Sequence, residues 1–254
     1  MGIVLKNQAE LVKMKQAGDV VRAVLDAVEA ACVPGVTTAD LDRIAARELA
    51  RHGAKSAYTG YSPGGLPAYP AVLCTSINHV VVHGIPSKRE VLREGDIIGI
   101  DFACYKHGFA ADAARTVAVG IVSAPARQLL ATTRECLARA IRACGPGQRL
   151  GDLGAAIQAH AGVGGYGLVR AFVGHGIGRH MHEDPSVPSV GVAGTGRRLK
   201  AGMTIAIEPM LTLGGGDVRV LADQWSVVTV DGSLAAHWEH TVAITDHGAE
   251  ILAA

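Results

Sequence analysis

The segment IIGIDFACYKHGFAAD, which spans residues 97–112, carries the clearest structural signal in the chain. Two apolar, strand-like runs flank a Lys-His-Gly turn, and this pattern predicts a β-hairpin. With Lys106 and His107 as the loop, Asp101 on the first strand lies directly opposite Asp112 on the second. Opposed side chains of a hairpin lie about 5 Å apart, so these two like charges would repel each other. A divalent cation between the two carboxylates would offset that repulsion.

A second interpretation of this hairpin needs no cation. The two aspartates would lie on a solvated face, or a bulged turn would offset them, because a slip of one residue in register sends a side chain to the other face of the sheet. The hairpin alone favours neither interpretation.

Two further acids lie in apolar strands. Glu208 interrupts the run MTIAIEPM at residues 203–210, and Glu239 precedes the run HTVAI. A single carboxylate in a buried strand pairs with an arginine more often than it binds a metal, but four such acids make that explanation progressively weaker. An oxygen-rich set of this kind suits hard divalent cations, and one imidazole would suit Mn, Fe, Co or Zn.

Two histidines are candidates for that imidazole and for related chemistry. His175 lies between two glycines in GHGIGRHMHE, which lets the backbone approach a site closely. His83 ends the apolar run VVVHGIP just before a turn. Taken alone, each is more often a hydrogen-bonded structural histidine than a ligand.

Outward from the hairpin, apolar periodicity predicts four helices. The first covers about 11–32 and ends before Pro34-Gly35, and the second begins with Thr38 as its N-cap and ends at Gly53. A third helix opens at Ser123-Ala124-Pro125, and a shorter one covers 151–161. Strand-like runs are predicted at 71–82, 97–105, 109–119, 167–173, 203–211, 224–230 and 236–245. This order predicts a single α+β domain over residues 1–254 with two internally similar halves.

Composition excludes several classes of protein. The chain has 254 residues, 49% of them hydrophobic, and a net charge of +1, which excludes intrinsic disorder and argues against nucleic-acid binding as the main function. Five cysteines without a C-x-x-C spacing predict a reducing compartment rather than a disulfide framework. The first residues resemble no secretory signal, and the uncharged stretch 56–87 contains too many prolines to span a membrane. We therefore expect a cytoplasmic protein.

The chain contains partial matches to motifs of other enzyme classes, but the residues around each match exclude that class. The sequence GYSPG at 60–64 has the pattern of a serine nucleophile elbow, but the proline-rich segment after it cannot form the helix that the elbow requires. The glycines of 174–178 and 191–196 match neither a dinucleotide fingerprint nor a P-loop.

Taken together, six motifs resemble those of the type I methionine aminopeptidases. They are VHGIP, IDFACY, AAD, GHGIGRHMHEDP, IEPM and EHT, and they occur in order across essentially the whole chain. The resemblance implies the pita-bread fold, in which helices cover a pseudo-two-fold-symmetric antiparallel sheet. It also implies a centre of two divalent metal ions (Co, Mn, Fe or Zn) and removal of the initiator methionine from nascent proteins with a small second residue.

The resemblance also implies a ligand set. Asp112 and Glu239 would bridge the two metals, Asp101 would serve one of them, and His175 with Glu208 would serve the other. This assignment agrees with the separate expectation that the two aspartates face each other across a cation.

Three catalytic residues follow from the same resemblance. Glu208 would take a proton from the attacking water and pass it to the leaving amine. His182 would hydrogen-bond the substrate carbonyl oxygen or its oxyanion, and His83 would hydrogen-bond the scissile amide.

The methionine pocket departs partly from the family pattern. Tyr69 and Trp225 match positions that help to enclose the methionine side chain, and Cys74 lies nearby by analogy. Leu66 stands where an aromatic residue is common, and Met181 replaces a common phenylalanine. We expect an apolar pocket that accepts a thioether.

Two rival functions share this resemblance. A dipeptidase or Xaa-Pro aminopeptidase of the same superfamily would usually carry an additional amino-terminal domain, for which the chain has no room. A non-enzymatic binding module for ribosomes or partner proteins would be expected to lose ligands, and all five positions are intact. We expect no amino-terminal targeting or zinc-finger extension, a monomer, no membrane or nucleic-acid partner, and transient contact with nascent polypeptide amino termini at the ribosome. Because the chain begins Met1-Gly2, it should be its own substrate.

Overall fold

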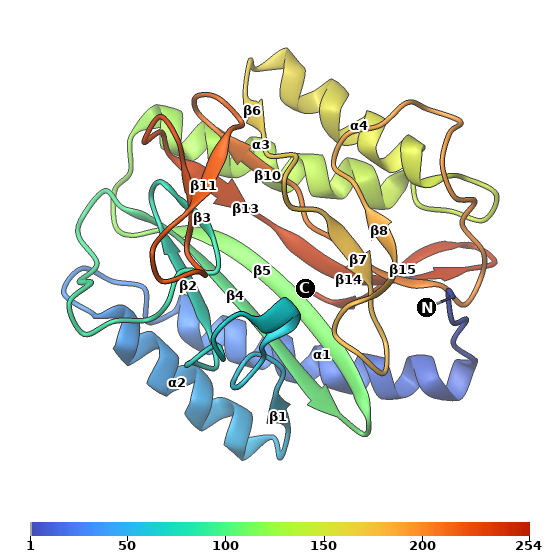
Figure 1. The fold of residues 1–254 in the computed structure, drawn as a ribbon, viewed down its shortest axis with the longest axis horizontal. Helices are drawn as coiled ribbons and strands as arrows, with labels where there is room; N and C mark the ends of the chain where they lie inside the picture. Colours follow the sequence, from blue (N-terminus) through green and yellow to red (C-terminus); the bar gives the residue numbers. More distant parts are fainter. Residues whose placement is uncertain (1) are drawn as a thin grey trace.

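The structure is a computed structural model that describes residues 2–254, with the arrangement shown in Figure 1. Met1, and with it the predicted self-processing, lies outside the described residues. Over this range the chain forms four α-helices: α1 (Gln8–Glu29), α2 (Thr38–Arg51), α3 (Ala124–Arg142) and α4 (Leu150–Val163), and one 3₁₀ turn, η1 (Pro63–Gly65). No helix among residues 2–254 combines the length and the apolar character that a membrane crossing needs.

The first residues of helices α1 and α2 are set by N-cap side chains that hydrogen-bond the first helical turn. The α1 cap, Asn7, accepts a hydrogen bond from the backbone of Glu10, as an N-cap residue should. The predicted cap of α2 was wrong by one residue. Thr37 is the cap, because its hydroxyl accepts from the Asp40 N–H while the Asp40 carboxylate accepts from the Thr37 N–H. Thr38 is instead buried in the first turn.

Most strands belong to one curled antiparallel sheet with the central order β1-β4-β5-β14-β9-β7-β8, in which β2 also pairs with β4 and β15 with β14. The strands of this sheet are β1 (Lys55–Ser56), β2 (Cys74–Ile77), β4 (Ile97–Lys106), β5 (Phe109–Ala118), β7 (Gly174–Gly176), β8 (Glu183–Val187), β9 (Thr204–Ile207), β14 (Glu239–Thr245) and β15 (Gly248–Ala253). Two small sheets contain β13 (Ala235–His237), β10 (Met210–Thr212) and β6 (Gly167–Leu168), and β11 (Val218–Val220), β12 (Val227–Thr229) and β3 (Val80–Val82).

The predicted strands differ from the observed ones mainly at breaks. Three predicted runs divide into two strands each, and the breaks fall at Asn78, which has a φ of 54°, at Pro209 and at Trp238. The run at 167–173 forms only the two residues of β6, and the run at 224–230 forms only β12. The sequence patterns predict none of β1, β7, β8, β11 and β15, because these strands are short or lack clear alternation.

The hairpin register is also corrected. His107 and Gly108 form the loop, with φ angles of 51° and 79°, and positive φ at both loop residues is what a two-residue type I′ turn requires. Lys106 therefore pairs with Phe109, so Asp101 lies opposite Ala114 and not opposite Asp112. The aspartates still share one face, because the offset is two residues and side chains alternate with a period of two.

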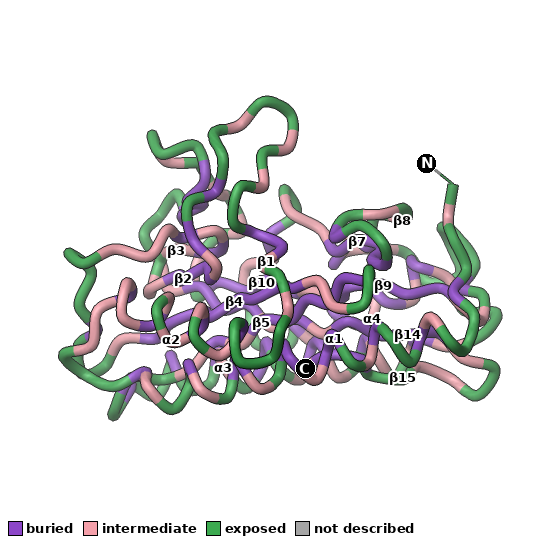
Figure 2. Tube along the Cα trace, turned by 90° about the horizontal axis from the view of Figure 1, so that it is seen from below, coloured by how far each residue is buried: buried purple, intermediate pink, exposed green. Residues whose placement is uncertain are grey.

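The two faces of the sheet have different roles. Ile98, Ile100 and Phe102 of β4 point toward α1 and α2 and are buried in an apolar cluster with them. In Figure 2 the helices lie along one side of the buried strands and the longer loops lie on the other. The intervening residues of β4, which include Asp101, therefore face the side that the loops surround. This α+β arrangement, with a helix pair in each half of the chain, is the predicted one.

Candidate metal centre

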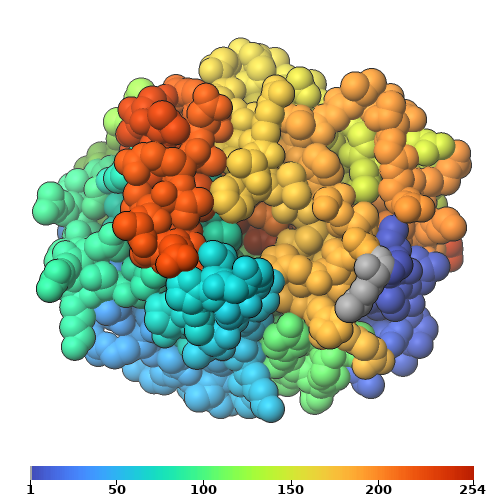
Figure 3. All heavy atoms as spheres, viewed as in Figure 1, coloured from blue at the N-terminus to red at the C-terminus, as the bar shows by residue number. Residues whose placement is uncertain are grey.

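A cavity of about 590 Å³ opens on the loop side of the sheet. Figure 3 shows this face hollowed near its centre, between the cyan segment that contains η1, the orange-red β11–β12 hairpin and the yellow-to-orange segment before β9. Every site residue predicted from the sequence lines this one cavity: Leu66, Tyr69, Cys74, His83, Asp101, Asp112, His175, Met181, His182, Glu208, Trp225 and Glu239. The structure therefore brings together residues that lie up to 173 positions apart in the chain.

Strand register places three of the acids in one row across the sheet. Asp101 on β4 and Glu239 on β14 both pair with Ala114, which lies between them on β5. Ile207 pairs with His240, so Glu208, the next residue along, lies beside Glu239. Because Ala114 has only a methyl side chain, the row leaves open space between its carboxylates.

The remaining two predicted ligands complete the group. Asp112 lies on β5 two residues before Ala114, and His175 lies on β7, which pairs with β9. Single ligand atoms of Asp112, His175 and Glu239 all lie within 4.8 Å of one another, and all three residues are buried. The imidazole Nε2 of His175 is 3.8 Å from Oε1 of Glu208. These separations suit donors that surround one ion.

Tyr58 is a member of the site that sequence reasoning missed. Its hydroxyl lies 2.5 Å from Oδ1 of Asp101 and 2.9 Å from Oδ1 of Asp112. A phenol has one proton, so it can donate to only one of these carboxylates at a time. The tyrosine follows the short strand β1, and nothing in its sequence neighbourhood distinguishes it from a core aromatic residue.

No lysine or arginine of the described residues forms an ion pair with these four acids. Arg115, the nearest cation along β5, points to the helix side, where it pairs with Asp26 and Glu29 of α1. Uncompensated negative charge in a buried place is costly, so the site requires either protons or an added cation.

The pKa shifts of the four acids also indicate that the site needs protons or an added cation. Burial, together with neighbouring acids, raises the pKa of Asp101, Glu208 and Glu239 well above the usual range. Burial also raises the pKa of Asp112 to about 6. Oε1 of Glu239 is buried without a hydrogen-bond partner among the described residues. A site with four carboxylates, an imidazole and an orphaned carboxylate oxygen fits divalent cations well.

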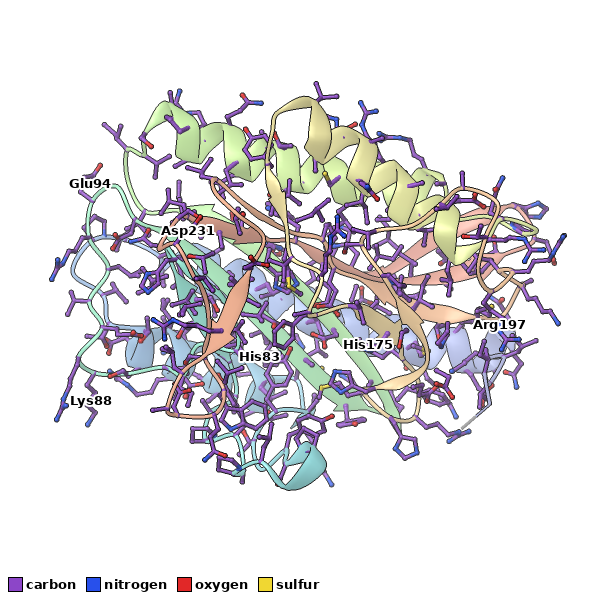
Figure 4. All side chains as sticks on the ribbon, turned by 45° about the horizontal axis from the view of Figure 1, so that its top comes forward. His83, Lys88, Glu94, His175, Arg197 and Asp231 are labelled. Carbon is purple, nitrogen blue, oxygen red and sulfur yellow. The ribbon has the colours of Figure 1, made fainter. Side chains whose placement is uncertain are left out.

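The histidines of the cavity are held as neutral donors or acceptors. Burial lowers the pKa of His175 to about 3 and that of His83 to about 4. Both lie in the middle of the molecule in Figure 4, whereas Lys88 and Arg197 lie at its edge. His182 lies at the exposed rim, where its Nδ1 is 2.7 Å from the Tyr61 hydroxyl and its ring centroid is 4.2 Å from that of His175.

An apolar compartment adjoins the charged group. The rings of Tyr69 and Trp225 meet edge to face with centroids 5.2 Å apart, and the Trp225 indole donates to the carbonyl of Pro67. Cys74 is buried opposite Asp101 in the β2–β4 pairing, and burial raises the pKa of its thiol, so this thiol is unreactive. Leu66 and Met181 also line the cavity and belong to the same apolar cluster as Tyr69, Cys74 and Trp225.

Comparisons with known proteins point to one family. The model of metallopeptidase family M24 matches residues 12–246. A methionine aminopeptidase of Clostridium acetobutylicum is 48% identical over 250 residues, which cover 98% of each chain, and methionine aminopeptidase 1 of Bacillus subtilis is 41% identical over the same share of each.

Solved structures show the same fold. The methionine aminopeptidase of Thermotoga maritima superposes with a TM-score of 0.95 at 43% identity and covers 99% of each chain. The prolidase of Pyrococcus furiosus superposes with a TM-score of 0.77 at 21% identity over 99% of this chain but only 65% of its own. The pita-bread architecture expected from the sequence is thus confirmed.

Proposed function

The chain belongs to metallopeptidase family M24, and on that basis we propose that its cavity removes the amino-terminal methionine from polypeptides whose second residue is small. The enzyme is an aminopeptidase, a metal-dependent hydrolase. The observation that carries the proposal is one cavity in which four buried carboxylates and an imidazole adjoin an apolar compartment lined by Tyr69 and Trp225. In this proposal the carboxylates take part in the reaction, and the apolar compartment binds the methionine side chain.

Five residues would hold two divalent cations. Asp101, Asp112, His175, Glu208 and Glu239 are the residues that would hold them, and the shared cavity and the short separations among donor atoms support this assignment. Bound there, the cations would act as Lewis acids that lower the pKa of a water molecule and stabilise negative charge on the substrate carbonyl.

The chain's own residues would orient the substrate and move the proton. Glu208 lines the cavity beside His175 and Glu239, and as a carboxylate it can take a proton from water and deliver it to the leaving amine. His182 at the rim can donate to the carbonyl oxygen. His83 is packed between Phe172 and Trp225 and can hydrogen-bond the scissile amide.

A peptide panel tests the proposal. We expect release of free methionine from Met-Ala-Ser and Met-Gly-Met-Met, loss of that release with a chelator, and no release from Xaa-Pro peptides. Release only from Xaa-Pro peptides would favour a dipeptidase or Xaa-Pro aminopeptidase. Absence of metal-dependent release from every peptide would favour a binding module.

The site of action is a further part of the proposal. We propose that the enzyme works as a monomer in the cytoplasm, on nascent chains that it meets transiently at the ribosome. All five cysteines are buried free thiols, which supports a reducing compartment. Light scattering on the purified protein and sedimentation with ribosomes test the monomer and the ribosome contact.

A His83→Ala variant should separate catalysis from metal binding. His83 lines the cavity but lies outside the group of metal-ligand candidates, so we expect kcat to fall about 10²- to 10³-fold. Metal content, measured by inductively coupled plasma mass spectrometry, should stay within about 20% of the unsubstituted protein, since no proposed ligand is removed. An equal loss of metal and turnover would refute the assignment.

A further inference from the structure

His237 is a buried histidine that the proposed mechanism does not use. Its side chain is 4% exposed, and its Nε2 has no hydrogen-bond partner among residues 2–254. The same atom lies 3.7 Å from Oε2 of Glu208 and 3.9 Å from Oε2 of Glu239. Both separations exceed a hydrogen bond by less than 1 Å, and a buried polar atom of this kind needs a partner.

The backbone fixes this histidine beside Glu208. His237 ends β13 and pairs with Met210 of β10, two residues after Glu208. The backbone N–H of His237 donates to the Thr116 hydroxyl at 2.8 Å, and its carbonyl accepts from the same hydroxyl at 2.8 Å. Because β5 and β10 both hold the backbone, the ring cannot move far from the two glutamates.

The carboxylate of Glu208 therefore lies between two imidazoles. Its Oε1 faces Nε2 of His175 at 3.8 Å, and its Oε2 faces Nε2 of His237 at 3.7 Å. An imidazole that approaches the second oxygen sets the rotation of the carboxylate, and hence which oxygen is presented to the cavity.

The state of the ring follows from its surroundings. A neutral imidazole carries one proton, on either Nδ1 or Nε2. When metal is bound the two carboxylates are ionised, and an Nε2 without a proton would then direct its lone pair at two carboxylate oxygens with no donor between them. If Nε2 carries the proton, a movement of less than 1 Å satisfies both groups.

We propose that His237 is a positioning residue that donates from Nε2–H to Oε2 of Glu208 and so directs Oε1 of Glu208 toward His175 and the proposed cations. The inference rests on the proposed metal centre and adds to it a supporting residue that is not itself a ligand. Partners that orient metal ligands in this way typically contribute 10- to 100-fold to metal affinity.

Two substitutions and a matched control test this role. Isothermal titration with Co²⁺ and with Mn²⁺ is performed on the full chain after metal removal. His237→Leu removes the donor, and we expect a 10- to 100-fold weaker affinity. His237→Gln keeps an N–H donor, so its affinity should stay within about threefold. His247→Leu, on the exposed turn before β15, should change nothing.

Activity of the loaded proteins provides a second readout. If His237 orients Glu208 for proton transfer, the Leu variant should lose kcat about 10-fold or more while KM changes less than about threefold, and the Gln variant should recover most of kcat. ¹⁵N NMR of the histidine rings in the unsubstituted protein, free and loaded with Zn²⁺, gives the position of the proton without any substitution. We expect it on Nε2 in the loaded state.

The outcomes distinguish failure of the proposed metal centre from failure of the proposed role of His237. If the unsubstituted protein binds none of these ions, both the metal centre and the role of His237 are wrong. If it binds them and His237→Leu binds equally well, only the role of His237 is wrong. Loss of the Nε2 proton on metal binding would make His237 a ligand and would overturn the positioning role.

Discussion

Removal of divalent cations is expected to reduce methionine release to less than about a thousandth of the loaded rate, and addition of Co²⁺ or Mn²⁺ is expected to restore it. The described residues offer no lysine or arginine to replace the cations beside Asp101, Asp112, Glu208 and Glu239. The measurement is release of methionine from Met-Ala-Ser before chelation, after chelation and after reloading.

Removal of the divalent cations should also change how the free energy of unfolding depends on pH. Burial raises the pKa of Asp101, Glu208 and Glu239 in the folded protein without metal. When the pKa of a carboxyl is higher in the folded than in the unfolded protein, the protonated carboxyl favours folding. This contribution to the free energy of unfolding is complete below the unfolded pKa, about 4, and is lost as the pH rises through the pKa of the folded protein. Between about pH 7.5 and 8.5 the buried histidines are neutral in the folded protein, and unfolded histidines, with a pKa near 6.5, are largely neutral as well, so they add little slope there. The metal-free protein should therefore become less stable across this range.

Thermal unfolding with and without metal checks this expectation. At about 100 times its dissociation constant, one ion would add about 2.7 kcal/mol to the free energy of unfolding. Because the ligands bind as ions, the difference in melting temperature between loaded and metal-free protein should grow with pH over the same range. A difference that shrinks with rising pH would contradict buried, protonated carboxylates in the metal-free state.

The sequence predicted which residues meet in the cavity better than it predicted how the strands arrange them. Glu208 and Glu239 could be recognised because a carboxylate inside an apolar run is unusual, and the aspartates because a hairpin brings them to one face. The hairpin register was wrong, since the choice between Lys106-His107 and His107-Gly108 as loop depends on backbone φ angles. The shared face was nevertheless right, because the error was an even number of residues.

Other features depend on distant contacts and left no local signal. Tyr58 reaches both aspartates across the β1–β4 edge, and His237 reaches Glu208 only because β13 pairs with β10. Ala114 creates space between Asp101 and Glu239, but in the sequence it is an ordinary small strand residue. Such roles become visible only when strand pairing is known, and pairing is not a property of any one segment.

A Glu208→Gln substitution is expected to lower kcat/KM by about 10³-fold or more, because it removes both a proposed ligand and the proposed proton carrier at nearly constant volume. The same change should stabilise the metal-free protein near pH 8, where the buried glutamate is costly and the amide is not. A decrease in activity together with an increase in metal-free stability distinguishes a functional acid from a structural one. Glu250→Gln, at an exposed position of β15, is the matched control and should alter neither quantity. Methionine release and metal-free melting temperatures test both effects, and a Glu208→Gln protein with more than a tenth of normal activity would exclude Glu208 as the proton carrier.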